Sequence, residues 1–169
     1  METLKAILTR YSVREYQPKP VPEPLVEQLL RAAMQAPSAH NRQPWHFVQI
    51  DDRGLLNAIA DYHPYAKMLY RAPLAIAVCS DRDLEKKEGY RILDCAAATE
   101  NILLAAHALG LGGVWIAVYP NQERMRKMAE LFHLPNRVEV ISMVAVGYPL
   151  NQKQTESRYR ADRIHRNGW

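Results

Sequence analysis

Apolar and polar residues recur along this chain with two different periods, one typical of helices and one typical of strands. Apolar side chains spaced by three or four positions predict five helices, over residues 2–9, 23–35, 53–60, 88–109 and 122–132. A further short helix is expected over 64–71, ended by Pro73. Apolar runs predict strands over 46–51, 74–79, 114–118 and 138–148. Residues 74–79 are all apolar, so this strand is expected to be buried.

The longest helical pattern, residues 88–109, is rich in alanine on several sides. We expect a central helix that is buried nearly all round, with small side chains that let another helix, such as one from a second subunit, approach closely. His107 on this helix is expected to be a core or interface histidine and not a catalyst. Gly110 is a natural end for the helix, because glycine readily adopts the left-handed conformation found there.

The run Gly110-Leu111-Gly112-Gly113 resembles a nucleotide-binding loop only superficially. The dinucleotide fingerprint follows a strand and opens a helix, whereas this run follows a helix and opens a strand. A Rossmann site is therefore excluded. Two adjacent glycines before a strand still let the backbone lie close against a flat ligand.

Composition and charge restrict the classes of function that remain. The 169 residues include 22 basic and 18 acidic side chains, and this mild net charge of +4 does not favour nucleic-acid binding. No apolar run reaches the ~20 residues of a membrane span, and no secretory signal is visible, so a cytoplasmic protein is expected. Cys79 and Cys95 lie in apolar surroundings and are expected to be buried thiols. The histidines form no ligand motif, so no metal site is expected.

The extended segment near the start of the chain carries the first candidate site. Alternation over residues 10–16 places Arg10, Ser12 and Arg14 on one face. Two guanidinium groups and a hydroxyl on one face suit a phosphate, because arginine offers a fork of donors. The alternative is that Arg10 interacts with a helix end and Arg14 pairs with an acid on the surface.

The stretch from Ala36 to Phe47 carries the second candidate site. Pro37 and Pro44 stiffen it without making it helical. Side-chain amides on Asn41 and Gln43 can donate and accept together, which suits the edge of a heterocyclic ring. The alternative is a rigid connector between helix and strand, capped by Ser38.

With these motifs in order, the chain strongly resembles the nitroreductase family of FMN-dependent oxidoreductases. The resemblance covers nearly the whole chain and rests on four motifs, which are Arg10-x-Ser12-x-Arg14, Ala36-Pro37-Ser38-x-x-Asn41-x-Gln43-Pro44-Trp45-x-Phe47, Gly110-Leu111-Gly112-Gly113-x-Trp115 and the arginine-bearing tail. It implies an α+β fold with a central, mostly antiparallel sheet flanked by helices. It also implies a homodimer with two FMN molecules at the interface. One domain, residues 1–150, is expected to be followed by a tail, 151–169, that packs on the dimer and cofactor site.

The resemblance also implies roles for individual residues. The FMN phosphate and ribityl end would be held by Arg10, Ser12 and Arg14, together with Arg158 or, alternatively, Arg160 of the tail. The flavin would be reached from the partner subunit by Pro37, Ser38, Ala39 and Asn41, and less certainly by Gln43. Backbone close to the flavin ring would come from Gly112 and Gly113.

The implied reaction is transfer of hydride or electrons from NADH or NADPH to a nitro compound, a quinone or a similar flat acceptor, in a ping-pong cycle. No catalytic side chain is assigned, because the flavin carries the redox chemistry. Two alternatives remain: other flavin chemistry on the same fold, such as reductive dehalogenation or flavin fragmentation, and a non-enzymatic flavin-binding module. Residues that could line the substrate slot are Tyr62, His63, Tyr65, His40 and Tyr119.

Overall fold

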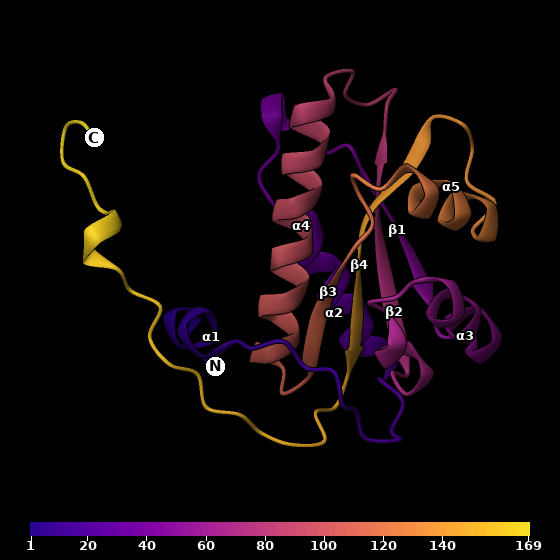
Figure 1. Ribbon diagram of the computed structural model, residues 1–169, viewed down its shortest axis with the longest axis horizontal. Helices are drawn as coiled ribbons and strands as arrows, with labels where there is room; N and C mark the ends of the chain where they lie inside the picture. The colour runs from indigo at the N-terminus through magenta and orange to yellow at the C-terminus, as the bar shows by residue number, and fades with distance from the viewer.

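The computed structural model describes all residues from Met1 to Trp169 as a sheet covered by helices, with a tail that leaves the body (Figure 1). Five α-helices are present: α1 (Thr3–Thr9), α2 (Glu23–Met34), α3 (Arg53–Tyr62), α4 (Glu88–Ala108) and α5 (Gln122–Leu131). Four strands form the sheet: β1 (Trp45–Ile50), β2 (Leu74–Asp81), β3 (Gly112–Ala117) and β4 (Val138–Gly147). Short 3-10 turns occur at η1 (Ala39–Asn41), η2 (Lys67–Tyr70) and η3 (Ala161–Arg163).

The sheet has the strand order β1-β2-β4-β3, and every neighbouring pair is antiparallel. Its two central strands have apolar sequences because both of their faces are covered. All eight residues of β2 are buried, and β4 is buried except for one residue. This arrangement confirms the predicted α+β class with an antiparallel sheet.

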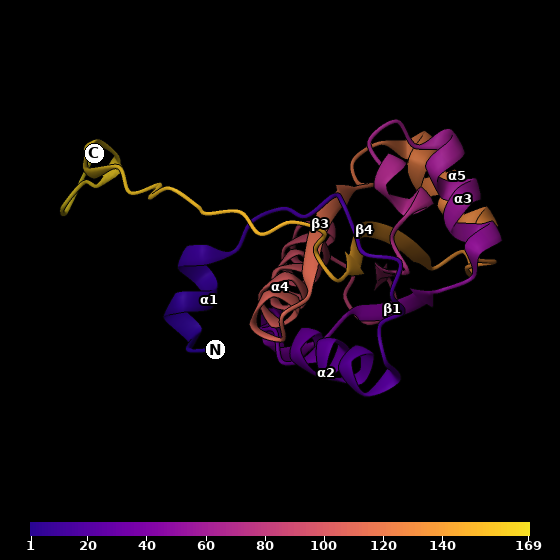
Figure 2. The ribbon, with the colours of Figure 1, turned by 90° about the horizontal axis from the view of Figure 1, so that it is seen from below.

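Helices cover both faces of the sheet (Figure 2). On one face, α2 and α4 pack against a core that includes Leu29, Ile76 and Ile102. On the other face, α3 and α5 pack with η2 against a second core that includes Ile59, Met128 and Met143. The two cores form because alternate residues of each strand point to opposite sides of the sheet.

Helix boundaries follow local capping chemistry. Asn121 precedes α5, and its Oδ1 accepts the Arg124 N–H at 3.0 Å, which confirms a predicted helix start. Gly110 adopts a φ of 77° just after α4, as predicted for the residue that ends this helix. The prediction that α4 is buried nearly all round is wrong for the single chain. Leu93 on its outer face is 68% exposed, because no element of the same chain covers that side.

Residues 10–16 lie in an extended conformation beside β3, as predicted. Ser12 forms an isolated parallel bridge with Gly113, and the Val13 N–H donates to the Gly113 carbonyl at 3.0 Å. The Tyr16 hydroxyl is buried and donates to the Val13 carbonyl at 2.6 Å. This segment therefore extends the sheet at its β3 edge.

Helix α1 and residues 151–169 are the parts of the chain that stand away from the body (Figures 1 and 2). Leu4 and Leu8 of α1 are each 72% exposed, and Trp169 at the end of the tail is fully exposed. The Thr155 hydroxyl donates to the Leu8 carbonyl at 3.1 Å, so the tail runs along α1. Exposed apolar side chains on two projecting segments leave a large amount of surface without a partner in one chain.

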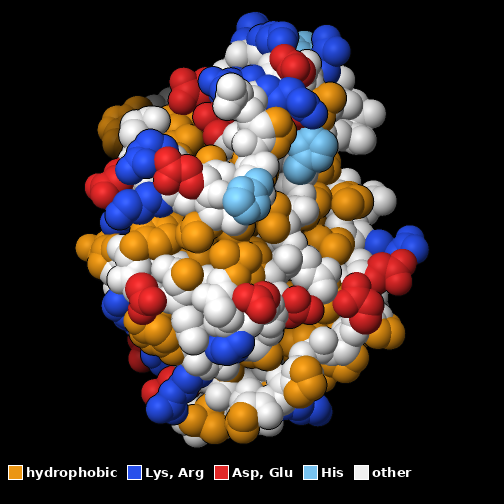
Figure 3. All heavy atoms as spheres, turned by 90° about the vertical axis from the view of Figure 1, so that its right-hand side faces the viewer, with side chains coloured by type: hydrophobic (Ala, Val, Ile, Leu, Met, Phe, Trp, Pro, Cys, Tyr) orange, Lys and Arg blue, Asp and Glu red, His pale blue; other side chains and the backbone are white.

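The charged surface is mixed. On the face shown in Figure 3, Lys and Arg side chains are interspersed with acidic ones and do not form one basic patch. None of the helices combines the length and the apolar character needed to cross a membrane.

Candidate functional site

The segment from Tyr11 to Arg14 alternates between buried and exposed positions. Val13 is buried against the core, whereas Ser12 and Arg14 are exposed on the other side of the segment. This alternation follows from the extended backbone and places the hydroxyl and the guanidinium together, as predicted.

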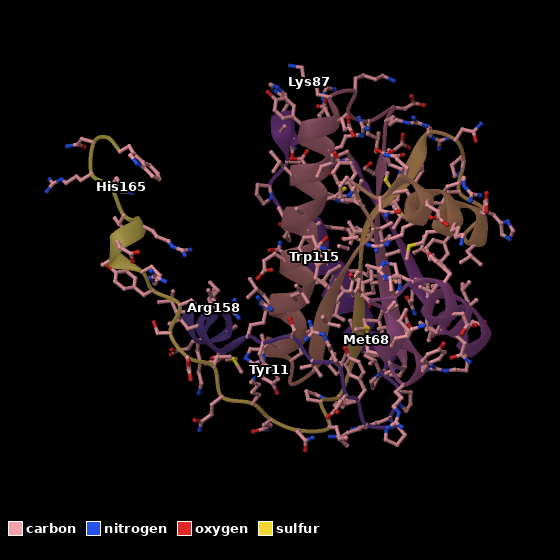
Figure 4. The ribbon with its side chains drawn as sticks, in the orientation of Figure 1. Tyr11, Met68, Lys87, Trp115, Arg158 and His165 are labelled. Carbon is pink, nitrogen blue, oxygen red and sulfur yellow. The ribbon has the colours of Figure 1, made fainter.

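A hollow of about 560 Å³, here called the polar hollow, lies between this segment and the tail. It is lined by Tyr11, Ser12, Arg14, Lys153, Gln154, Thr155, Glu156, Ser157 and Arg158. Arg158 and Tyr11 lie at the same end of the molecule, beside α1 (Figure 4). Arg160 forms a two-bond ion pair with Asp162, with N–O distances of 3.0 and 2.9 Å. The geometry therefore favours Arg158 over Arg160 as the tail residue that joins Ser12 and Arg14.

Arg10 does not line the polar hollow. Its Nε lies 3.3 Å from Oε1 of Glu100 on α4, and only 21% of the side chain is exposed. Burial is the larger cause of the lowered pKa of nearby His107, and the charge of the Arg10 guanidinium lowers this pKa further. His107 is half-buried and lies 2.8 Å from the Thr9 hydroxyl through its Nε2, so it connects α4 to α1. Arg10 thus adds positive charge behind the hollow and does not point into it.

A second hollow, of about 430 Å³, lies on the other side of Arg14, and we call it the apolar hollow. It is lined by Arg14, Pro64, Tyr65, Lys67, Met68, Val114, Trp115, Ile116 and Ala117. Trp115 on the edge strand β3 is 37% exposed, which is unusual for so large an apolar side chain. Because Arg14 lines both hollows, a ligand bound across them would meet a cation at the junction of a polar end and a flat, largely apolar end.

Lys67 of the apolar hollow was not predicted as a site residue. Its Nζ donates to the Ala60 carbonyl at 2.7 Å, which holds the ammonium group beside η2. The sequence shows only a lysine in a short helical stretch, and nothing in its spacing relates it to Arg14. Its place in the site depends on the packing of η2 against the rest of the fold.

Gly112 and Gly113 begin β3 but line neither hollow. A Cβ on Gly112 would lie 2.8 Å from Val13 Cβ, closer than real Cβ atoms approach, and at a tight 3.0 Å from Pro149 Cγ. A Cβ on Gly113 would lie 3.1 Å from a methyl group of Val144. The small size of Gly112 is therefore needed for Val13 to pack on β3, and this packing positions Ser12 and Arg14.

Residues 37–43 form a compact turn over α4. Pro37, Asn41 and Gln43 are exposed, and Ser38 and Ala39 are half-buried. The Ser38 Oγ accepts the Gln43 N–H at 3.0 Å, so Ser38 closes the turn and does not cap η1. The Asn41 and Gln43 side chains are bonded to each other at 2.9 Å.

This turn and the arginine segment lie at different positions along α4. The turn contacts the N-terminal half of the helix, where the His40 and Tyr90 rings meet edge to face. The arginine segment contacts the C-terminal half, where the Tyr11 ring meets His107 edge to face and Arg10 pairs with Glu100. Tyr90 and His107 are separated by roughly 25 Å along the axis, from the rise of 1.5 Å per residue. None of residues 37–43 lines either hollow, so one chain does not bring the two predicted groups into one site.

The residues expected to line the substrate slot also lie in different places. Tyr65 lines the apolar hollow, whereas His63 is fully buried and its Nε2 lies 3.0 Å from the Ala117 carbonyl. Burial lowers the pKa of His63 and raises that of Tyr62 to about 12, so neither group titrates as an ordinary surface residue. Neither His40 nor Tyr119 lines the two hollows.

An arginine-bearing polar hollow that adjoins a largely apolar one has the chemistry to bind an anionic ligand with an apolar ring. Residues 7–65 and 57–148 match the model of the Nitroreductase family, so the chain belongs to this family. This finding confirms the resemblance seen in the sequence motifs.

Relatives with similar sequences and structures agree with this assignment. A protein of Methanothermobacter thermautotrophicus, provisionally named NADH dehydrogenase/NAD(P)H nitroreductase, is 46% identical over 100% of this chain and 88% of its own length. A solved structure from Parabacteroides distasonis with the same provisional name has a TM-score of 0.95 at 40% identity, covering 99% of this chain and 98% of the other. An FMN-dependent nitroreductase from Clostridium difficile R20291 has a TM-score of 0.87 at 27% identity, covering 95% and 96%.

Proposed function

We propose that this protein is an FMN-dependent oxidoreductase that transfers hydride or electrons from NADH or NADPH to a nitro compound, a quinone or a similar flat acceptor. The observation that carries the proposal is the position of Arg14 between the polar hollow and the apolar hollow. The names of similar proteins support the same class of reaction. Because NADH and NADPH are intracellular metabolites, we propose that the protein works in the cytoplasm.

The polar hollow fits the phosphate and ribityl end of FMN. Arg14 and Arg158 have no carboxylate partner, and the Ser12 hydroxyl lies beside them, so these groups are available to donate to an anion. Arg10 would act on the phosphate through its charge from behind the hollow, because its Nε is paired with Glu100 and it does not line the hollow. Together, these side chains would hold the phosphate and fix the direction in which the rest of the cofactor extends.

The apolar hollow fits the ring system. Trp115 and Met68 line it with apolar, polarizable surface, and Lys67 supplies a cation. Bound FMN would supply hydride and single-electron chemistry at its ring. The side chains around the hollow bind and orient the ring, and none of them has to act as an acid or a base. We propose that Gly112 and Gly113 serve the ring site indirectly. Because Gly112 has no Cβ, Val13 packs closely on β3, and this packing positions Ser12 and Arg14.

The remaining predicted contacts require a second copy of the chain. Along α4, Asp94, which holds Ala39, is separated by roughly 9 Å from Glu100 and by roughly 20 Å from His107, the two contacts of the arginine segment. A homodimer that pairs the exposed face of α4 with α1 and the tail would bring the turn of one subunit to the polar and apolar hollows of the other. The exposed Leu93 and Leu8 support such an interface.

We propose that residues 1–150 are the FMN-binding domain and that residues 151–169 pack on the dimer and cofactor site. The tail already supplies Arg158 to the polar hollow and runs along α1. Beyond Arg158 it leaves its own body, and the rings of His165 and Trp169 stack on each other with centroids 4.3 Å apart (Figure 4). An exposed aromatic pair at the end of an extended tail is suited to dock on a neighbouring subunit.

We further propose that donor and acceptor use the open face of the bound flavin ring in turn, which gives ping-pong kinetics. One open face of the ring does not hold two large flat molecules together. Oxidised nicotinamide would therefore leave before the acceptor binds. Parallel lines in double-reciprocal plots of NADH against acceptor would support this order, and intersecting lines would contradict it.

The central experiment is a flavin spectrum followed by an acceptor screen. We expect the purified protein to be yellow, or to bind added FMN, and to oxidise NADH or NADPH in the presence of a nitroaromatic or a quinone. A colourless protein that does not bind FMN would refute the flavin assignment. A yellow protein that turns over neither acceptor class would favour other flavin chemistry or a non-enzymatic flavin-binding module.

Removal of the tail tests the dimer proposal. A chain that ends at residue 150 is expected to lose Arg158 together with the proposed docking segment, and therefore to bind FMN much more weakly. Sedimentation of the full and shortened chains measures whether the dimer is lost as well. A shortened chain that dimerises and holds FMN like the full chain would contradict the role of the tail.

A further inference from the structure

The turn formed by residues 37–43 has an unusual backbone. Three residues that are not glycine adopt left-handed conformations, His40 with φ 52°, Asn41 with φ 54° and Gln43 with φ 49°. Such conformations are uncommon for residues with a Cβ and persist only where the surrounding structure holds them. The turn is therefore a shape that the rest of the protein has to maintain.

Most hydrogen bonds of this turn are internal. Ser38 accepts from Gln43, and the Asn41 N–H donates to the Ser38 carbonyl at 3.0 Å. The single hydrogen bond from residues 37–43 to another element joins the Ala39 N–H to Oδ1 of Asp94 on α4, at 3.1 Å. This bond is the polar tether of the turn to the body.

Asp94 is in a costly environment for a carboxyl group. It is 6% exposed, and its Oδ2 has no hydrogen-bond partner. Burial raises its pKa, the Ala39 N–H lowers it, and the nearby Glu85 raises it further. Arg91, one turn before it, does not compensate, because its guanidinium binds Glu139 at 2.8 Å and backbone carbonyls. A buried carboxyl group with one unsatisfied oxygen lowers the free energy of unfolding. This cost is consistent with a function of its other oxygen, which accepts from Ala39.

A side chain is needed at this position because the backbone of α4 is not available. Its carbonyls are used by the hydrogen bonds of the helix itself, so an N–H that approaches from the side finds no acceptor there. Aspartate is short enough to keep its carboxyl close to the helix and still accept from Ala39. We propose that Asp94 is a positioning residue for flavin binding, whose buried Oδ1 fixes the turn that presents Ser38 and Asn41 to the cofactor site of the partner subunit.

This inference rests on the proposed function, and three variants test it. Asp94→Ala removes the acceptor and is expected to weaken FMN binding about tenfold or more, the usual effect of losing one such bond. Asp94→Asn keeps an Oδ1 acceptor and is expected to stay within about threefold of the wild-type protein. Thr99→Ala is the matched control, because Thr99 lies on the same helix as Asp94 and the change loses a buried hydrogen bond to Ser142 of β4 without touching the turn. Its FMN affinity is expected to be unchanged.

Amide hydrogen exchange of the protein without FMN gives a second readout. The Ala39 amide is expected to exchange slowly in the wild-type protein and in Asp94→Asn, and faster in Asp94→Ala. Equal weakening of FMN binding in both Asp94 variants, or wild-type affinity in Asp94→Ala, would overturn the inference, and so would unchanged exchange at Ala39. If the wild-type protein binds no FMN, the proposed function fails, and the exchange rate alone decides whether Asp94 holds the turn.

Discussion

Replacement of Gly112 by alanine tests how the fold builds the proposed phosphate site. The new Cβ would overlap a γ-methyl group of Val13 and lie 2.8 Å from its Cβ, and it would lie 3.0 Å from Pro149 Cγ. Rotation of the valine side chain removes the first contact but not the second, because Cβ is fixed to the backbone. The segment that carries Ser12 and Arg14 therefore has to move away from β3.

The expected cost follows from these contacts. Overpacking a well-filled core by one methyl group costs typically about 1–3 kcal/mol. The upper part of this range applies because Val13 is only 5% exposed and its N–H is bonded to Gly113. We expect Gly112→Ala to lower the free energy of unfolding by about 2–3 kcal/mol. FMN affinity is expected to fall at least about tenfold, because Arg14 moves with the segment.

Urea unfolding and FMN titration measure the two effects. Gly89→Ala is the matched control, since a Cβ there meets no atom within 4 Å, and its stability is expected to be unchanged or slightly raised. The double variant Val13→Ala with Gly112→Ala is expected to be more stable than the sum of the single effects predicts, because the γ-methyl overlap is gone. Wild-type stability and FMN affinity in Gly112→Ala would refute the reasoning.

Three further predictions concern charge and burial. Arg14→Ala is expected to weaken FMN binding about ten- to hundredfold, whereas the exposed Arg126→Ala leaves it unchanged, as measured by fluorescence titration. Burial alone would raise the pKa of Asp81, but a backbone N–H and the Arg137 guanidinium outweigh it and hold the pKa below its usual value. The lowered pKa stabilises the folded protein at pH values above the ordinary pKa of about 4, and this stabilisation is lost as the pH falls through the lowered value. Asp81→Asn should therefore flatten this part of an acid unfolding curve. Burial raises the pKa of the Cys79 thiol to about 12, so a thiol reagent at pH 8 is expected to react only after unfolding.

Local sequence patterns predict most of the elements because helices and buried strands have strong periods. Strand β3 begins at Gly112 and not at Val114 as predicted, because its first two residues pair with Gly147 and Val146 of β4. Glycine has little tendency to form strands, so this pairing is set by the neighbouring strand and not by local preference. The alanines of α4 predicted a helix buried nearly all round, with room for a helix of a second subunit, and within one chain its outer face at Leu93 is exposed.

The candidate site is predictable only where one short segment carries it. Ser12 and Arg14 share a face because of strand alternation, which is a local property. Arg158 joins them only through the path of the tail, and the choice between Arg158 and Arg160 depends on the ion pair with Asp162. Lys67 has no such local signal, since its relation to Arg14 arises from tertiary packing.

The same long helix explains why the proposed site needs two subunits. Helix α4 contacts the turn in its first third, at Tyr90 and Asp94, and the arginine segment in its second half, at Glu100 and His107. A rigid helix cannot shorten this separation, so a second, antiparallel copy is the simplest way to bring a start and an end together. Two such sites would then form at once, one at each end of the paired helices. On this basis, FMN affinity should fall with dilution into the range where the dimer dissociates, and an affinity independent of protein concentration across that range would place each cofactor within one chain.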